Sequence, residues 1–443
     1  MSTFPSPCGT IGTAESGKIL PDFEHIRRTP VKRSLYVLFL LTLIAPAARA
    51  DDKPKVEFRD GDRIALVGNE FFERDQERGY IETELTSRFP DKNLTFRNLG
   101  YSGDTVRADA RNLCSGWAVF GPADQGFDRL KDLIEHIKPT LVFVAYGMNE
   151  SFDGPAGLDS FTQGLSRMLD MVSAGGARVV LISPIRHEDL GRPLPDPAAH
   201  NQNIRLYCDA LEKVAQQRNC PFIDLYEALG DSSQEKPGTF LTFDGIHLTP
   251  FGYWKCAAVL ERAMGYPPRR WDVNIDTRAG KAEAIGTKID EIKTGEKGIT
   301  FNGTDDFLPL AQPPEDAPKS AAAEAHHRVL KFTGLSPGQY VLKSGDQTIA
   351  SGSADDWAKG IALHSGPAQD QEEELRKLVV AKEFDFFNFW RPDNDTYIFG
   401  YRKHEQGRNA VEIPMFEPLV EAKEAQIAKL RVPVTQAYVL SRE

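Results

Sequence analysis

Short apolar runs alternate with amphipathic stretches between about residues 60 and 266. The run at 140–145 is continuously apolar, as is typical of a strand buried on both faces. The runs that predict strands are Arg63–Val67, Leu94–Leu99, Thr140–Ala145, Arg178–Ser183 and Pro221–Leu225. The stretches that predict helices are 76–89, 124–137, 158–174, 198–217 and 250–264, the last of which begins with Thr249 as N-cap and Pro250 in the first turn. This alternation predicts an α/β fold in which helices cover both faces of a parallel sheet.

The pattern changes after residue 268. Short β-like runs separated by turn residues then continue to about residue 365. They are Trp271–Ile275, Lys297–Phe301, Arg328–Phe332, Gln339–Lys343 and Gln347–Ala350. Residues 269–365 are therefore predicted to form a small β-sandwich-like module.

Residues 366–443 predict a helical, aromatic-rich C-terminal tail. Helical periodicity covers 369–382 and about 416–430, and eight aromatic residues lie between 384 and 401. Packing of these rings against the first domain is the ordinary interpretation. A platform on which sugars stack is the alternative.

The N-terminal segment resembles a secretory signal peptide. Arg27, Arg28, Lys32 and Arg33 precede an apolar run at 34–44, and Ala48-Arg49-Ala50 is a small-x-small cleavage motif. The apolar run is shorter than the roughly 18–20 residues that a membrane span needs. We therefore expect residues 1–50 to be a signal peptide with an N-terminal extension, and a mature protein that is secreted or periplasmic, with an uncleaved anchor as the alternative. The α/β domain then covers residues 51–268.

Charge and cysteine content exclude several classes of protein. The chain has 53 Lys and Arg against 64 Asp and Glu, and its net charge of −11 disfavours nucleic acid as a partner. No CxxC or HExxH motif is present, so we do not expect a structural zinc or zincin site. No residue pattern leads us to expect another metal or a cofactor. Cys114, Cys208, Cys220 and Cys256 allow three disulfide connectivities, among which the sequence does not choose.

Candidate chemistry lies in four short segments. Each of the first three follows a predicted strand, and the fourth precedes the last helix of the α/β domain. Ligands of open α/β sheets bind at the carboxyl ends of the strands. The segments are Gly68-Asn69-Glu70, Ser102-Gly103-Asp104-Thr105, Gly147-Met148-Asn149-Glu150 and Asp244-Gly245-Ile246-His247.

Residues 60–266 resemble the SGNH, or GDSL-type, ester hydrolases in three of these four segments. The resemblance implies an oxyanion hole made by the Gly103 amide and the Asn149 side chain. It also implies that Asp244 and His247 are the acid and base of a catalytic triad. An ester is the implied substrate, either a small molecule or a polysaccharide, and an acylated carbohydrate fits an exported member of the family.

The first segment departs from the family pattern. The family has Gly-Asp-Ser there, whereas this chain has Gly68-Asn69-Glu70, so Glu70 stands at the nucleophile position. His247 then has no hydroxyl to activate at that position. Two hypotheses follow: atypical or weak hydrolysis with water activated by His247 or Glu70, and a non-catalytic pocket that binds esters or carbohydrates. Ser102 and Ser151 are displaced from the nucleophile position and are weak substitutes.

Overall fold

The computed structural model describes residues 55–112, 124–230, 239–295, 298–315, 317–318, 321, 328–400, 402–406 and 410–443. All of these described residues belong to one compact unit. The predicted signal peptide and Cys114 lie outside the described residues.

A five-stranded parallel sheet forms the centre of the first domain and confirms the predicted α/β fold. Its strand order is β2-β1-β3-β4-β5, and every neighbouring pair is parallel. The strand bounds are β1 Arg63–Gly68, β2 Thr95–Gly100, β3 Leu141–Ala145, β4 Arg178–Ile182 and β5 Phe222–Ile223. The chain order reverses beside β1, so the carboxyl ends of β1, β2 and β3 meet at one place on the sheet edge.

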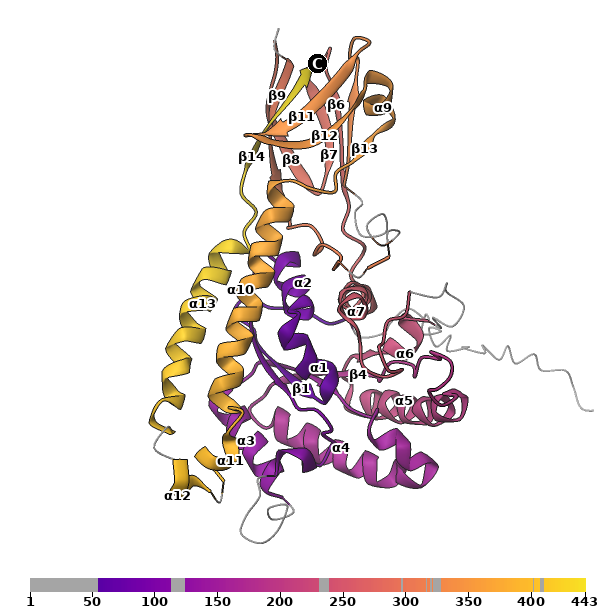
Figure 1. Cartoon of the computed structure of the whole chain (residues 1–443), viewed down its shortest axis with the longest axis vertical. Helices are drawn as coiled ribbons and strands as arrows, with labels where there is room; N and C mark the ends of the chain where they lie inside the picture. The colour runs from indigo at the N-terminus through magenta and orange to yellow at the C-terminus, as the bar shows by residue number, and fades with distance from the viewer. Residues whose placement is uncertain are drawn as a thin grey trace, which may run out of the picture. The chain divides into compact units, whose positions relative to one another are not determined.

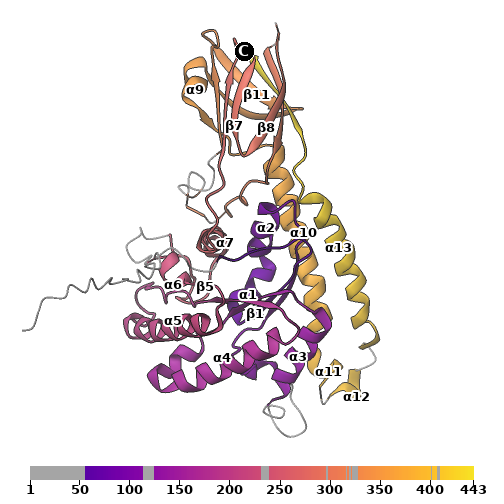
Figure 2. The same ribbon diagram turned by 180° about the vertical axis from the view of Figure 1, so that it is seen from behind.

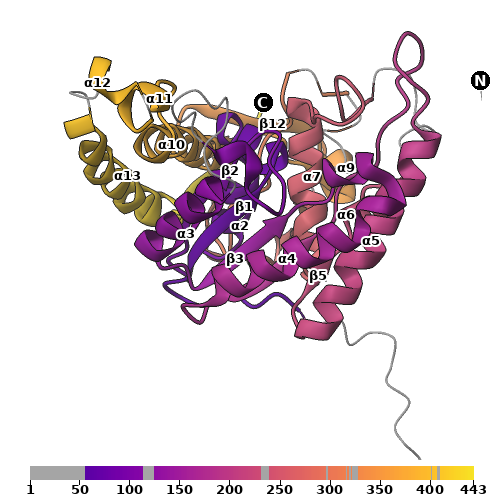
Figure 3. The same cartoon turned by 90° about the horizontal axis from the view of Figure 1, so that it is seen from below.

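Helices cover both faces of this sheet (Figure 3). Side chains of α2 and α7 pack with those that β1 and β3 direct to one face, and side chains of α3 and α4 pack on the other face. Helix α5 lies beside α4 (Figure 2). The bounds are α2 Tyr80–Arg88, α3 Gln125–Ile137, α4 Leu158–Ser173, α5 Ala198–Arg218, α6 Leu225–Ala228 and α7 Pro250–Ala263. The Thr249 side chain accepts a hydrogen bond from the Gly252 amide, which confirms the predicted cap of α7.

The segment after β1 differs from its sequence prediction. Instead of one helix over 76–89, a short helix α1 (Glu70–Glu73) and a 3₁₀ turn η1 (Arg74–Glu77) precede α2. The charged run Glu73-Arg74-Asp75 is typical of a solvent-exposed helix start. Asp75 is nevertheless buried, and its carboxyl group accepts hydrogen bonds from the amides of Tyr80 and Ile81. Burial raises the pKa of Asp75 to about 7. Because a short polar turn has no periodic signal, the sequence could not separate these elements.

Two further sheets pack against each other and confirm the predicted β-sandwich-like module. The four-stranded sheet has the order β13-β10-β6-β7, and the antiparallel five-stranded sheet has the order β12-β11-β14-β9-β8. Trp271 and Phe332 of the first sheet share one apolar core with Phe301 and Leu342 of the second. The bounds are β6 Trp271–Asp276, β7 Lys281–Ile285, β8 Thr287–Gly295, β9 Gly298–Asp305, β10 Arg328–Thr333, β11 Gln339–Ser344, β12 Gln347–Ser353, α9 Ala354–Lys359 and β13 Ile361–Ala362.

The C-terminal region is mainly helical, as predicted. Helices α10 (Pro367–Trp390) and α13 (Phe416–Leu430) lie side by side (Figure 1). Helix α10 extends eight residues beyond the predicted end at residue 382, so that Phe386 and Trp390 pack in the core of the α/β domain. The shorter elements are α11 Asp395–Ile398, α12 Lys403–Gln406 and η6 Ile413–Met415. An unpredicted strand, β14 (Gln436–Arg442), pairs with β9 and β11 of the module.

Buried charges fasten α10 to the α/β domain. Lys382 is fully buried, and its Nζ lies 2.5 Å from Glu82 Oε2 on α2 and 2.9 Å from Glu383 Oε1. Removal of one member of such a buried group leaves an uncompensated charge in the core. The tail is thus bound to the α/β domain by charge as well as by aromatic packing.

A buried carboxyl on α10 should make stability depend on pH. Burial, together with the nearby Glu373 carboxylate, raises the pKa of Glu372 to about 8. Between the ordinary glutamate pKa of about 4.3 and this value, only the unfolded chain has released the proton, so stability falls as pH rises. We expect the stability advantage of Glu372→Gln over the wild type to be about 3–4 kcal/mol larger at pH 8 than at pH 5, as measured by thermal unfolding.

The matched control is Glu374→Gln on the exposed side of the same helix. Its unfolding curve should follow the wild type at both pH values. A constant difference between Glu372→Gln and wild type across this range would contradict the titration.

Among the described residues, three cysteines are free: Cys208, Cys220 and Cys256. No helix in the described part of the chain combines the length and apolar character required to cross a bilayer.

Candidate active site

The first predicted segment forms the turn between β1 and α1. The Asn69 side chain accepts a hydrogen bond from the Phe71 amide at 3.2 Å and caps α1. Glu70 is the first residue of that helix and is only 6% exposed. Tyr253 of α7 donates its hydroxyl to the carbonyl oxygens of Glu70 and Phe71, at 3.2 and 3.0 Å. The backbone around Glu70 is therefore fixed from two sides.

The structure brings the predicted oxyanion donors onto the Glu70 carboxyl group. The Gly103 amide and Asn149 Nδ2 each donate to Glu70 Oε2 at 3.3 Å. Asn149 Nδ2 also donates to the Asp104 carbonyl oxygen at 2.9 Å. Asn149 precedes the turn η3 (Glu150–Gly157), and its side chain makes no cap hydrogen bond to that turn. Gly103 has a φ of +74°, a conformation that glycine adopts without strain.

Two buried carboxyl groups hold the loops that contain these donors. Asp104 Oδ2 lies 2.7 Å from Arg111 Nε and accepts the Tyr146 hydroxyl at 2.8 Å. Arg111 belongs to the 3₁₀ turn η2 (Asp109–Arg111) and also donates to the Leu99 carbonyl oxygen at 2.7 Å. The Glu150 carboxyl group accepts hydrogen bonds from the backbone amides of Val106 and Gly147, at 2.8 and 2.9 Å. Burial raises the pKa of Glu150 to about 7.

The last segment forms a hydrogen-bonded pair between Asp244 and His247. Asp244 Oδ2 lies 2.6 Å from His247 Nδ1, and Asp244 Oδ1 accepts the amides of Ile246 and His247. Partial burial opposes ionisation of Asp244, but these hydrogen bonds and the imidazole together hold its pKa below the ordinary value. A proton on Nδ1 that faces Asp244 leaves Nε2 as the basic nitrogen.

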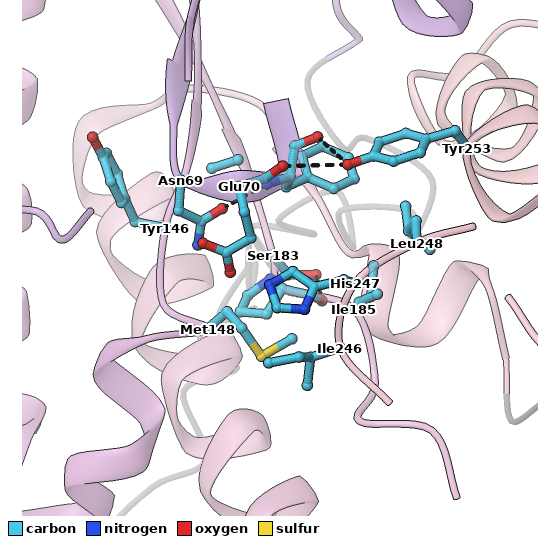
Figure 4. Close-up of a pocket in the computed structure, with 13 residues that line it drawn as sticks. Asn69, Glu70, Tyr146, Met148, Ser183, Ile185, Ile246, His247, Leu248 and Tyr253 are labelled. Carbon is cyan, nitrogen blue, oxygen red and sulfur yellow. Dashed lines mark hydrogen bonds between the residues drawn. The ribbon is translucent and has the colours of Figure 1, made fainter. Parts of the chain in front are cut away.

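Glu70 and His247 line the same pocket, at the carboxyl end of the parallel sheet. Figure 4 shows the Glu70 carboxyl group and the His247 imidazole pointing into it from opposite walls. The pocket encloses about 410 Å³, including space open to solvent. Its lining is mostly apolar: Asn69, Glu70, Phe71, Ala145, Tyr146, Met148, Ser183, Pro184, Ile185, Ile246, His247, Leu248 and Tyr253.

Comparison with known proteins agrees with this arrangement of segments. Residues 61–255 match the model of the GDSL-like lipase/acylhydrolase family, also called SGNH. This part of the chain belongs to that family. Among curated proteins, none matches the chain significantly.

Solved structures with a similar fold include a gut microbial diltiazem-metabolizing enzyme. It is 20% identical, with a TM-score of 0.69 over 87% of this chain and 99% of its own. The shared fold therefore extends past the family match into the C-terminal modules. An acetylxylan esterase from Geobacillus stearothermophilus is 16% identical, with a TM-score of 0.39 over 48% of this chain and 98% of its own. A GDSL-like lipase from Bacteroides thetaiotaomicron is 21% identical, with a TM-score of 0.32 over 46% and 88%.

Two hydroxyl groups close to the site, those of Ser151 and Ser183, are engaged elsewhere. Ser151 is fully buried, donates to the Met148 carbonyl oxygen at 2.6 Å and lies 2.8 Å from His200 Nε2. Ser183 lines the pocket, but its hydroxyl donates to the Pro184 carbonyl oxygen and accepts the Tyr226 amide. Ser102 contributes its backbone amide, which Glu73 accepts. Neither Ser102 nor Ser151 is among the described residues that line the pocket.

Sequence reasoning missed several residues that support the site. Glu188 is buried and accepts the amides of Leu241 and Thr242, which anchors the loop that ends in His247. Tyr253, Arg111 and Glu188 lie between or beyond the family segments, where no local pattern marks them. Asp104 and Glu150, by contrast, lie inside segments already singled out. Among the described residues, no group of three or more His, Cys, Asp or Glu side chains could hold a metal ion.

Proposed function

We propose that this protein hydrolyses ester bonds by direct attack of a water molecule. The observation that supports this most is the single pocket in which the Asp244–His247 pair faces Glu70 and the two donors gathered on it. Apart from a serine, these are the parts that a hydrolase of this family needs. In the proposed reaction, a water molecule takes the place of the serine hydroxyl as the nucleophile.

In the proposed reaction, His247 acts as general base and then as general acid. Nε2 takes a proton from water while the water oxygen bonds to the ester carbonyl carbon. The tetrahedral intermediate then breaks its bond to the alcohol oxygen, which receives the proton from Nε2. Asp244 holds the imidazole in the required tautomer and stabilises its cation. The products are a carboxylic acid and an alcohol.

Glu70 makes this reaction slow but does not forbid it. Its two hydrogen bonds from Gly103 and Asn149 are 3.3 Å long, against about 2.9 Å for a strong N–H···O bond, so the donors are weakly held. Oε1 accepts no hydrogen bond from the described residues and can orient water. A developing oxyanion must nevertheless share the donors with a carboxylate, and loss of one donor in such sites costs roughly 2.7–4 kcal/mol. Oxyanion stabilisation and binding alone still accelerate hydrolysis about 10³–10⁴-fold over water.

A small acyl group on a carbohydrate is the substrate class that we propose. The apolar walls formed by Ala145, Met148 and Ile185 suit a short acyl chain. Phe243 is 55% exposed, and its ring stacks on His247 with centroids 5.6 Å apart. A flat aromatic surface beside the base suits a sugar ring. Export from the cytoplasm, which we propose from the N-terminal segment, brings the protein to extracellular or periplasmic polysaccharide.

The test is release of p-nitrophenol from p-nitrophenyl acetate by residues 51–443. We expect turnover above the rate in buffer. Turnover by Glu70→Ala should be slower if the main role of Glu70 is to orient the water, and faster if its carboxylate mainly competes with the oxyanion for the Gly103 and Asn149 donors. Equal rates for Glu70→Ala and wild type would remove Glu70 from the mechanism. Absence of turnover, both with this ester and with acetylated xylan, would overturn the proposal.

A binding protein without catalysis is the second candidate, because the Glu70 carboxylate already occupies the oxyanion donors. In that case acetylated xylo-oligosaccharides should bind to the wild type and to His247→Ala with equal affinity in calorimetry. No acetate should be released during the measurement. Acetate release by the wild type alone would exclude this candidate.

A further inference from the structure

The end of helix α10 reaches the loop that contains Gly103. Arg391, the C-cap of α10, places Nη1 2.6 Å from Glu73 Oε1. The other oxygen of Glu73 accepts the backbone amide of Ser102, the residue before Gly103. One carboxylate therefore joins the C-terminal helix to the loop that supplies an oxyanion donor.

Aromatic packing reinforces this connection. The Arg391 guanidinium lies 3.4 Å from the centroid of the Tyr101 ring, and the buried Trp390 ring lies 6.2 Å from that of Tyr101. The Arg391 and Glu73 side chains are only 20% and 14% exposed, so water screens their attraction less than at an open surface.

The backbone of α1 approaches the same loop closely. A Cβ atom on Gly100 would lie 2.2 Å from the Glu73 backbone nitrogen, a distance that no side chain could occupy. Glu73 is thereby held beside the start of the loop, and only the direction of its carboxylate remains to be set. Arg391 is the cation that sets it.

We propose that Arg391 is a positioning residue for the oxyanion loop, which makes helix α10 part of the site although it lies outside the family match at 61–255. Without Arg391, Glu73 becomes an unpaired, half-buried carboxylate that turns toward solvent and releases the Ser102 amide. The Gly103 amide then loses its fixed direction. The connection itself is independent of catalysis, whereas its effect on rate rests on the proposed ester hydrolysis.

Hydrogen–deuterium exchange of residues 51–443, read on peptides that cover 99–106, tests the connection without any turnover. We expect Arg391→Ala to exchange roughly tenfold faster there than the wild type, because a charge-assisted hydrogen bond is lost. Arg391→Lys, which can still pair with Glu73 through one bond, should stay within about twofold of the wild type. Arg402→Ala is the matched control, since Arg402 pairs with Glu405 in the same C-terminal region. It should leave exchange at 99–106 unchanged.

Glu73→Gln keeps the side-chain shape and removes the charge that Arg391 binds. It should reproduce the faster exchange, and adding Arg391→Ala to it should cause no further increase, because both changes break one connection. If Arg391→Ala does not fold, exchange at 99–106 in Glu73→Gln tests the connection between Arg391 and the loop. Wild-type exchange at 99–106 in Glu73→Gln, or in a folded Arg391→Ala, would overturn the proposal.

The activity measurement separates this proposal from the function itself. If the wild type hydrolyses p-nitrophenyl acetate, Arg391→Ala should lower kcat roughly tenfold with little change in KM, as expected for an interaction made mainly in the transition state. A rise in KM alone, at unchanged kcat, would count against positioning. If the wild type is inactive, the proposed function fails and the exchange results still decide whether Arg391 fixes the loop.

Discussion

Replacement of Glu70 by serine should raise the rate of p-nitrophenyl acetate hydrolysis about a hundredfold or more. The substitution places a hydroxyl at the carboxyl end of β1, in the pocket that His247 lines. It also removes the carboxylate from Gly103 and Asn149, so both donors become available to the oxyanion. The new nucleophile and the open oxyanion hole should act together. In serine hydrolases, the rate with a complete triad exceeds the rate that remains after its removal by far more than a hundredfold.

The measurement is steady-state release of p-nitrophenol, with a burst of acyl-enzyme formation as a second signature. Glu70→Ala is the matched control, because it frees the donors without adding a nucleophile. The double change Glu70→Ser with His247→Ala should lose the gain. If Glu70→Ser is no faster than Glu70→Ala, residue 70 does not stand where a nucleophile can attack, and the assignment of Glu70 to that position is wrong.

Replacement of His247 by alanine should lower the wild-type hydrolysis rate roughly a thousandfold. The imidazole is the base that faces the pocket, and its Nδ1 is engaged by Asp244 at 2.6 Å. Loss of the ring leaves Glu70 as the only carboxylate among the described residues that line the pocket.

Asp244→Asn is the informative companion to His247→Ala. It retains the imidazole but replaces the acceptor of the Nδ1 proton by a side chain that can also donate, so the wrong tautomer becomes populated. We expect a loss of at least about a hundredfold in kcat with a folded protein and an unchanged melting temperature within a few degrees. Full activity of His247→Ala would assign the base to Glu70 instead.

The Glu70 carboxyl group lies on the two donors that would otherwise bind an oxyanion. Its carboxylate accepts bonds from two donors that converge on one point, Oε2, so the geometry suited to an oxyanion is preserved although an anion of the protein occupies it. Buried Arg111 and Asp104 hold the same loop. The polar supports of the site are thus intact around Glu70.

Most of the α/β domain could be predicted from the sequence because its signals are local. Each predicted strand from β1 to β5 overlaps an observed one, since continuous apolar runs in an alternating pattern have few other arrangements. Two edge strands of the sandwich, β7 and β8, could not be predicted. β7 and β8 are largely exposed and carry little apolar alternation, so they lack the signal that reveals β6 or β10.

Long-range pairings could not be predicted in the same way. β14 lies between β9 and β11, although more than 90 residues separate it from β11 in the chain. The burial of Asp75, Glu372 and Lys382 likewise depends on which helix faces which. A charged residue on a helix predicts solvent exposure unless a distant partner is known.

The sequence by itself determined that Gly68-Asn69-Glu70, Gly103, Asn149 and the Asp244–His247 pair lie in order along a strand-and-helix frame, because short motifs and apolar periodicity are properties of neighbouring residues. Only the tertiary structure decided that the Glu70 carboxylate accepts the bonds of Gly103 and Asn149, and that Arg391 reaches the loop from a helix almost 300 residues further along the chain. Those contacts depend on the packing of α10 and on side-chain directions at the sheet edge. Such geometry is fixed by the whole folded chain and not by any segment of it.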